Sequence, residues 1–177
     1  MKELVILVDE NDTEVGAGEK LRMHQEGKLH RAFSVFIFNS KGELLIQRRA
    51  GGKYHSAGLW SNTCCGHPRP GEGVNEAAQR RLEEEMGFAC PLRMAFSFRY
   101  NTRLEQGLIE NEYDYVFCGT YDSNPEPNSE EVAGWKWTDT DEIRKDMLRN
   151  PNSYTHWFKI AIKRLDQTGK STKNSET

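Results

Sequence analysis

Stretches rich in β-branched and aromatic residues alternate with turn-forming residues along much of the chain. Such runs are typical of β-strands, and the turn formers mark where strands end. The pattern predicts five strands, at residues 4–8, 32–38, 44–48, 113–121 and 132–137. The segment Asn-Ser-Lys-Gly after the second strand is short enough to join it to the third as an antiparallel hairpin.

Helical patterns occupy three other segments. Residues 74–86 form the first, and Gly87 is a suitable residue to end it. The second helix is predicted at 138–148 and the third at 154–165. Because single helices interrupt the strands without a regular alternation, we expect an α+β fold in which a mixed β-sheet is sandwiched between helices.

The length of 177 residues suits one domain, which we place at residues 1–166. Residues 167–177 are too polar to pack and are expected to form a disordered tail. The apolar run at 4–8 is far too short for a signal sequence or a membrane span. We therefore expect a cytoplasmic protein, and the oligomeric state is left open.

The net charge of -3 and the pI near 6.0 give the chain no general attraction for polyanions. Neither nucleic acid nor a membrane is expected as a partner. Any recognition of phosphate must come from a few local cations, which points to a small-molecule site.

Two of the four cysteines, Cys64 and Cys65, are adjacent and are followed by Gly66 and His67. Adjacent cysteines make a strained pair, and thiols stay reduced in the cytoplasm, so no disulfide is expected here. A zinc site, a packed core position and a reacting thiol all remain open for these side chains.

The 23 positions that follow carry a recognisable pattern. Gly66 is followed after five residues by Glu72, and seven residues later by the run Arg-Arg-Leu-Glu-Glu-Glu-Met-Gly-Phe at 80–88. This resembles the Nudix box, a loop-helix-loop that holds a divalent cation against a diphosphate. It departs from the family pattern at one informative position, because Arg81 stands where the pattern has Glu.

This departure changes the chemistry expected of the box. Arg81 shares a helix face with Glu84 and Glu85. A hydrolytic site needs carboxylates to hold magnesium and activate water, whereas a guanidinium grips diphosphate oxygens directly. The box therefore predicts that a diphosphate is held and not cleaved. The alternative is a solvated helix face, which the spacing of the glycines and Glu72 disfavours.

Several more stretches, in the right order, resemble the type 1 isopentenyl-diphosphate isomerases. They lie at 19–24, 29–39, 48–68, 98–100 and 109–117, and the resemblance covers about residues 3 to 165. It implies a metal-dependent, flavin-independent isomerase of isoprenoid synthesis. Such an enzyme would interconvert isopentenyl and dimethylallyl diphosphate, moving a double bond through a tertiary carbocation.

The resemblance also implies residue roles. The reactive thiol of the family falls on Cys65, and Glu112, assisted by Tyr100, would be the second proton-transfer group. The reaction needs an acid and a base on opposite faces of a flat C5 unit.

Two rival functions remain. One is a Nudix hydrolase of nucleoside or sugar diphosphates, and the other is a catalytically silent binding module with a structural zinc on Cys64, Cys65 and His67.

A mixed set of nitrogen and oxygen ligands matches the family's metal site and suits manganese, zinc or magnesium. These ligands are His24, His30, His67, Glu110 and Glu112. If Glu110 and Glu112 lie on a strand, their separation by two residues would point both carboxylates to one face of the sheet. A magnesium ion bound with the diphosphate would be held by Glu85 and the backbone carbonyl of Cys65.

Four cations are placed around the diphosphate by the resemblance: Lys20, Arg49, Lys53 and Arg81. Trp157 matches an aromatic that faces the carbocation, where a desolvated cation-π contact is worth ~2 kcal/mol or more. The alternative for Trp157 is an ordinary core position on the apolar side of the last helix.

Overall fold

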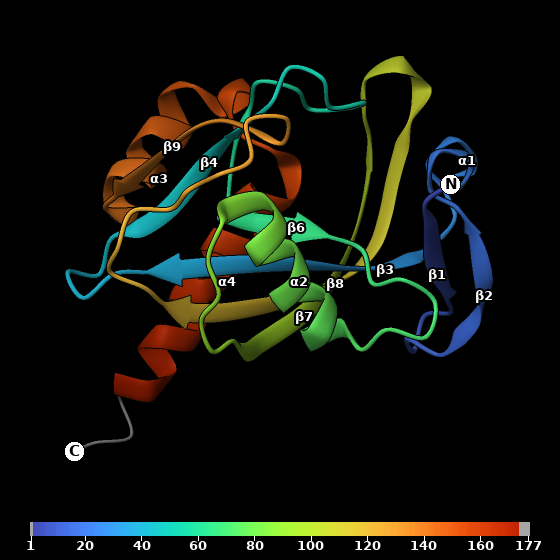
Figure 1. Cartoon of the computed structure of the whole chain (residues 1–177), viewed down its shortest axis with the longest axis horizontal. Helices are drawn as coiled ribbons and strands as arrows, with labels where there is room; N and C mark the ends of the chain where they lie inside the picture. The colour runs from blue at the N-terminus through green and yellow to red at the C-terminus, as the bar shows by residue number, and fades with distance from the viewer. Residues whose placement is uncertain (1, 174–177) are drawn as a thin grey trace.

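The computed structural model describes residues 2–173, with side chains described as far as residue 165. Its strands form one mixed sheet of nine strands, with helices on both faces (Figure 1). The strands are β1 (Leu4–Val8), β2 (Glu14–Glu19), β3 (His30–Phe38), β4 (Leu44–Arg49), β5 (Trp60–Ser61), β6 (Cys64–Gly66), β7 (Arg93–Arg103), β8 (Ile109–Thr120) and β9 (Val132–Thr138). The helices are α1 (Lys20–Glu26), α2 (Val74–Met86), α3 (Thr140–Arg149) and α4 (His156–Lys173), with 3-10 turns at Glu105–Gly107 and Pro151–Ser153.

The centre of the sheet is the parallel pair of β3 and β8, in register from His30 opposite Glu112 to Phe38 opposite Thr120. β7 extends the sheet antiparallel to β8. The other edge of β3 is shared, because β1 pairs at its start, β6 in its middle and β4 at its end. The remaining pairs are antiparallel, so the predicted mixed sheet is confirmed.

Alternate residues of β3 pack into two separate cores. Val35 belongs to the cluster that α2 covers with Leu82, whereas Phe36 belongs to the cluster that α4 covers with Phe158. In Figure 1, α2 crosses in front of the sheet and α4 lies behind it. Because both faces are covered, β3 is a nearly continuous apolar run. The predicted α+β sandwich is therefore observed.

The helix α2, which contains the charged run of the Nudix-like motif, spans Val74–Met86 as predicted. It ends at Gly87, whose φ of 74° lies in the left-handed region. A side chain at this position would also collide with the Glu126 carbonyl. The position therefore requires glycine for both its conformation and its space.

Some expectations need correction. The antiparallel hairpin predicted from 32–38 and 44–48 forms, but its ladder is limited to Phe38 opposite Leu44, and β4 pairs more extensively with β9 from Leu44 onward. α4 continues to Lys173, so the backbone at 167–173 is helical where a disordered tail was predicted. Residues 174–177 of that tail lie outside the described residues, and the domain boundary at 166 stays a prediction.

The sequence pattern missed the strands β2, β5, β6 and β7 and the helix α1, and it started β8 too late. β2 is mostly exposed and contains two glycines, and α1 has only seven residues, so neither gives a periodic signal. The start of β8 carries two glutamates, Glu110 and Glu112, that are nevertheless buried. No helix among the described residues is long and apolar enough to cross a membrane.

Candidate active site

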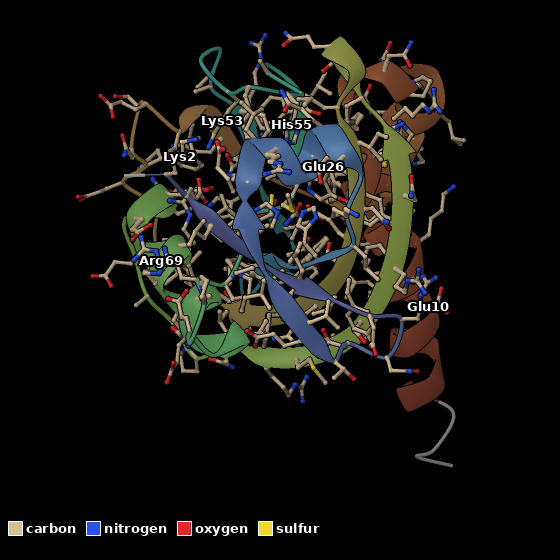
Figure 2. The ribbon with its side chains drawn as sticks, turned by 90° about the vertical axis from the view of Figure 1, so that its right-hand side faces the viewer. Lys2, Glu10, Glu26, Lys53, His55 and Arg69 are labelled. Carbon is tan, nitrogen blue, oxygen red and sulfur yellow. The ribbon has the colours of Figure 1, made fainter. Side chains whose placement is uncertain are left out.

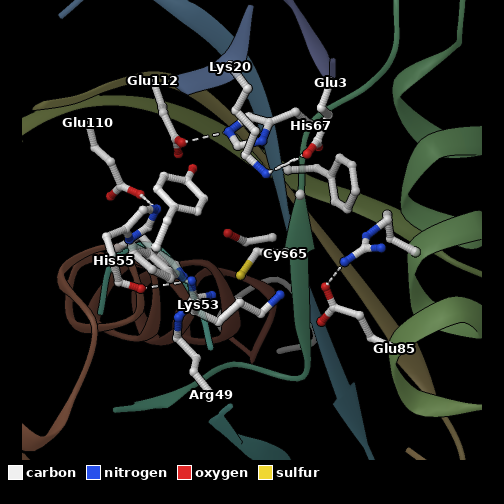
Figure 3. Close-up of a pocket in the computed structure, with 16 residues that line it drawn as sticks. Glu3, Lys20, Arg49, Lys53, His55, Cys65, His67, Glu85, Glu110 and Glu112 are labelled. Carbon is white, nitrogen blue, oxygen red and sulfur yellow. Dashed lines mark hydrogen bonds and ion pairs between the residues drawn. The ribbon is translucent and has the colours of Figure 1, made fainter. Parts of the chain in front are cut away.

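A pocket lies beside the central strands β3, β6 and β8 and is shown in Figure 3. Ten of the residues that the sequence predicts for the site line it: Lys20, Arg49, Lys53, Cys65, His67, Arg81, Glu85, Glu110, Glu112 and Trp157. The remaining three, His24, His30 and Tyr100, lie behind this lining and contact it. The fold therefore gathers the whole predicted set in one place.

β6 separates the two adjacent cysteines. Cys64 pairs with Val35 and is fully buried in the core under α2, whereas Cys65 pairs with Ser34 and lines the pocket. Successive side chains of a strand point to opposite faces, so the two sulfurs cannot converge on one zinc ion. Both thiols are free, and burial raises the pKa of Cys65 to about 12. Cys65 is therefore a protonated thiol near neutral pH.

Glu110 and Glu112 point to the same side of β8 and are both buried. His67 Nε2 lies 3.0 Å and His30 Nε2 3.4 Å from Glu112 Oε1. Burial opposes ionisation of Glu112, but these two imidazoles hold its pKa well below the usual range. Burial, together with the charge of Glu112, raises the pKa of Glu110 well above its usual range. The pair therefore holds one proton, on Glu110.

Tyr100 joins the two carboxyl groups. Its hydroxyl lies 2.8 Å from Glu110 Oε2 and 2.7 Å from Glu112 Oε2. A phenol has one proton to donate, and burial raises the pKa of Tyr100 well above its usual value, so it remains a donor. The three groups form a short hydrogen-bonded chain in which a proton can move between Glu110 and Glu112.

The histidines behind the pocket are oriented by backbone carbonyls. His24 Nδ1 lies 2.7 Å from the carbonyl of Lys20, and His30 Nδ1 lies 2.8 Å from that of Lys28. A carbonyl only accepts, so each Nδ1 carries a proton and each Nε2 faces the cluster, where it lies 3.3 Å from the Tyr54 hydroxyl in His24 and 3.4 Å from Glu112 Oε1 in His30. This is the arrangement in which a second hydrogen bond prepares a histidine to bind a metal.

The donor set fits a divalent metal ion. The ligand atoms of His24, His30, His67 and Glu112 all lie within 4.8 Å of one another, and all four residues are buried or partly buried. His30 Nε2 and His67 Nδ1 are buried without a hydrogen-bond partner among the described residues. Glu110 falls in an overlapping group with His24 and His55. The cluster is therefore a candidate metal site that includes four of the five predicted ligands, and Glu110 belongs to the neighbouring group that shares His24.

His55 was missed by the sequence analysis. It lies in the loop between β4 and β5, lines the pocket, and places Nε2 3.3 Å from Glu110 Oε1. Burial lowers its pKa to about 3, so it is neutral at pH 7. A single histidine in a loop has no periodic or spacing signal, and only the folded chain brings it to Glu110.

The Nudix helix α2 presents charge to the opposite end of the pocket. Arg81 contacts Glu85 and donates to Glu84 at 2.8 Å, while Gln47 Nε2 donates to Glu85 at 2.9 Å. Glu85 is only 4% exposed. The i,i+4 ion pairs expected on a solvated helix face do form, between Arg80 and Glu84 and between Arg81 and Glu85. Because Arg81 and Glu85 also line the pocket, the alternative of a purely solvated face is excluded.

Trp157 belongs both to the core cluster under α4 and to the pocket wall, so its position fits either sequence alternative and its role stays a prediction. Its indole Nε1 donates to Asn62 Oδ1 at 3.1 Å. The Asn62 amide is itself fixed by donating to the carbonyls of Val35 and Cys64. The guanidinium of Arg49 lies 5.4 Å from the indole ring centroid. The orientation of the indole is therefore set by buried hydrogen bonds.

Comparison with known proteins agrees with this description. Residues 28–158 match the NUDIX domain family. The crystal structure of DR0079 from Deinococcus radiodurans has a TM-score of 0.78 at 21% identity, covering 92% of this chain and 98% of that one. A MutT protein from Methanosarcina mazei has a TM-score of 0.66 at 22% identity, covering 80% and 96%. Fold and box together define a Nudix-domain protein.

Sequence relatives narrow the class. An isopentenyl-diphosphate Delta-isomerase 1 of Aromatoleum aromaticum is 53% identical over 165 residues, 93% of each chain. An isopentenyl-diphosphate Delta-isomerase of Serratia proteamaculans is 50% identical over 93% of this chain and 92% of its own, and one of Streptomyces griseus is 48% identical over 88% and 80%. The chain belongs to the isopentenyl-diphosphate Delta-isomerase family.

Proposed function

We propose that Cys65 and Glu112 are the two proton-transfer groups of the reaction that this chain catalyses, the interconversion of isopentenyl diphosphate and dimethylallyl diphosphate. The observation that carries the proposal is their placement. Cys65 is on β6 and Glu112 on β8, the two strands that flank β3, and both line one pocket. A flat C5 unit between them would meet one proton-transfer group on each side.

Their resting protonation states are complementary. Cys65 carries a proton because burial raises its pKa to about 12, and Glu112 is ionised because the pKa of its carboxyl is held low. Addition of a proton at one end of the double bond gives a tertiary carbocation, and removal of a proton two carbons away gives the isomer. One group of the pair donates and the other accepts, and the roles exchange in the reverse direction.

Tyr100 and Glu110 support the second group. Tyr100 is within hydrogen-bond distance of both carboxyl groups, so Glu112 can exchange a proton with Glu110 without contact with solvent. Trp157 faces the same cavity and would stabilise the cation through its ring.

We propose a metal ion in the histidine-glutamate cluster, held by His24, His30, His67, Glu110 and Glu112. Manganese, zinc and magnesium all suit these donors. When bound, the ion would fix the two carboxyl groups and make a proton on them more acidic. The backbone hydrogen bonds that orient His24 and His30, and the unpartnered nitrogens of His30 and His67, support this assignment.

The substrate's other end would lie against Lys20, Arg49, Lys53 and Arg81, which share the pocket. A magnesium ion bound with the diphosphate would take Glu85 and the backbone carbonyl of Cys65 as ligands. Charge-assisted contacts of this kind are the strong ones in diphosphate recognition. Membership of the isomerase family makes a C5 isoprenoid diphosphate, and not a nucleotide, the expected ligand.

The test is a comparison of substrates. Purified protein with magnesium and manganese is incubated separately with isopentenyl diphosphate, nucleoside diphosphates and sugar-nucleotide diphosphates. We expect dimethylallyl diphosphate from the first and no cleavage of the diphosphate bond in any of them. Cleavage of a nucleotide substrate, with an inert isopentenyl diphosphate, would support a hydrolase and contradict the proposal.

A further inference from the structure

Three of the four cations assigned to the diphosphate already have carboxylate partners in this structure. Lys20 Nζ lies 3.2 and 3.0 Å from the two carboxylate oxygens of Glu3, a contact visible in Figure 3. Lys53 contacts Glu131, and Arg81 Nη2 lies 3.5 Å from Glu131 Oε1. Neither glutamate belongs to the Nudix helix, and neither has a role in the proton chemistry above.

Arg49 is the exception among these cations. It forms no ion pair within 4 Å in the described part of the chain, where its Nη2 donates to the carbonyl of His55 at 3.2 Å. Its Nε is buried without a hydrogen-bond partner among the described residues. One donor of the site is therefore free for an incoming anion, while the other three cations must first exchange partners.

Glu131 is held beside its two cations by its own backbone. Its amide donates to the carbonyl of Asn128 at 3.0 Å, and its carbonyl accepts from the amide of Ala50 at 3.0 Å. The Asn128 amide in turn donates to the carbonyl of Glu85 at 2.9 Å. This tether keeps the carboxylate at a high effective concentration next to Lys53 and Arg81.

Both glutamates stand where the pocket opens to solvent. A wider outer cleft shares Lys20, Lys53 and Arg81 with the pocket and is lined by Glu3 and Glu131 as well. Figure 2 shows Lys53 with Lys2 and Arg69, which line the same cleft, on one side of the molecule. The Glu131 side chain is 25% exposed, so its carboxylate can turn outward into water when it is displaced.

Substrate and product carry the same diphosphate, so contacts to it stabilise the ground state and the transition state alike. Binding of this uniform kind lowers KM without accelerating the chemical step, and excess affinity slows product release. Carboxylates that compete with the diphosphate for the same cations reduce this excess affinity. They also keep the cations paired while no anion is bound.

We propose that Glu3 and Glu131 are internal counterions, which the diphosphate displaces on binding and which replace it on release, thereby setting the affinity of the site. This inference rests on the proposed diphosphate site. The opposite role for Glu131 is that of a ligand for the diphosphate-bound cation, beside Glu85. The two roles predict opposite changes in affinity.

The test is titration calorimetry of inorganic diphosphate in the presence of magnesium. The proteins are the wild type, Glu3→Gln, Glu131→Gln, the double variant, and Glu130→Gln as a control that removes the same charge from the same loop. We expect about three- to tenfold tighter binding in each single variant, a further gain in the double variant, and little change in the control.

The same variants give a second readout in the isomerase assay, where KM falls and kcat does not rise. Unchanged or weaker diphosphate binding in Glu131→Gln would overturn the inference, as would an equal gain in Glu130→Gln. The calorimetry does not depend on isomerisation. If the wild type binds diphosphate but leaves isopentenyl diphosphate unchanged, the proposed function fails. The counterion inference is then still decided by the calorimetry of the variants.

Discussion

Cys64 and Cys65 are consecutive residues that lie on opposite faces of the same sheet. Cys64 packs in the core beneath α2, and Cys65 lines the pocket on the other face. The three-residue strand β6 fixes this difference through its pairing with Val35 and Ser34 of β3. A pair that is ambiguous in the sequence is therefore divided by the fold into one packing residue and one candidate for chemistry.

This division predicts different results for two alanine substitutions. Cys65→Ala should lose nearly all turnover while still binding diphosphate, because it removes a proposed proton carrier without touching the cations. Cys64→Ala should keep its turnover and lose about 1 kcal/mol of unfolding free energy, because it leaves a small cavity. Steady-state kinetics and urea denaturation of both variants check the prediction, and substantial turnover in Cys65→Ala would refute the assignment.

Arg81 is predicted to act in substrate binding and not in the proton transfers. Arg81→Gln removes a guanidinium that lies in the pocket beside Glu84 and Glu85. Loss of a charge-assisted contact of ~1.5–3 kcal/mol corresponds to a KM increase of about ten- to a hundredfold. Arg80→Gln is the matched control, because Arg80 forms its ion pair with Glu72 instead. An equal effect of both substitutions on KM would mean that Arg81 only supports the helix.

Metal affinity should depend on pH through Glu110. The pKa of this carboxyl is raised by burial and by Glu112, so in the metal-free protein it keeps its proton to a higher pH than an ordinary carboxyl and must lose that proton to bind a metal. The affinity should therefore fall about tenfold per pH unit as the pH drops below the raised pKa. His67, whose pKa burial lowers to about 4, contributes only in more acidic solution.

Manganese titrations between pH 5.5 and 8.5, in buffers of different ionisation enthalpy, test this dependence. We expect release of about one proton per ion in the neutral range. Glu110→Gln should abolish the release and flatten the pH dependence. A proton release that persists in this variant would assign the proton to another group.

Trp157 should act through its ring face and not through its N–H group. Trp157→Phe keeps an aromatic ring but loses the hydrogen bond to Asn62, so kcat should fall only a few-fold. Trp157→Leu loses the cation-π contact of ~2 kcal/mol, which corresponds to a fall of about thirtyfold in kcat. Equal losses in the two variants would indicate that Trp157 is only a packing residue.

The sequence is most informative where local geometry determines structure. The helix of the box was predicted at its observed limits because Gly87 ends it through a conformation that only glycine adopts easily. The spacing of Glu110 and Glu112 was enough to place both carboxyl groups on one face once they lay in a strand. The residues predicted from the family motifs all lie in or beside one pocket.

The sequence is least informative where long-range contacts determine a role. His55 meets Glu110, and Glu131 meets Lys53, only because separate loops converge on the pocket. Asn62 fixes Trp157 across 95 residues of chain, which no spacing rule relates. The buried start of β8 was missed for a similar reason, since its carboxyl groups are stabilised by histidines from other elements.

The most direct test of the two-group mechanism is proton exchange followed by NMR. The protein is incubated with isopentenyl diphosphate, magnesium and manganese in deuterium oxide, beside Cys65→Ala and Glu112→Gln. The account predicts dimethylallyl diphosphate that carries deuterium from solvent in its C5 unit, with neither product nor exchange in the variants. Product formed without solvent deuterium, or undiminished turnover in either variant, would contradict it.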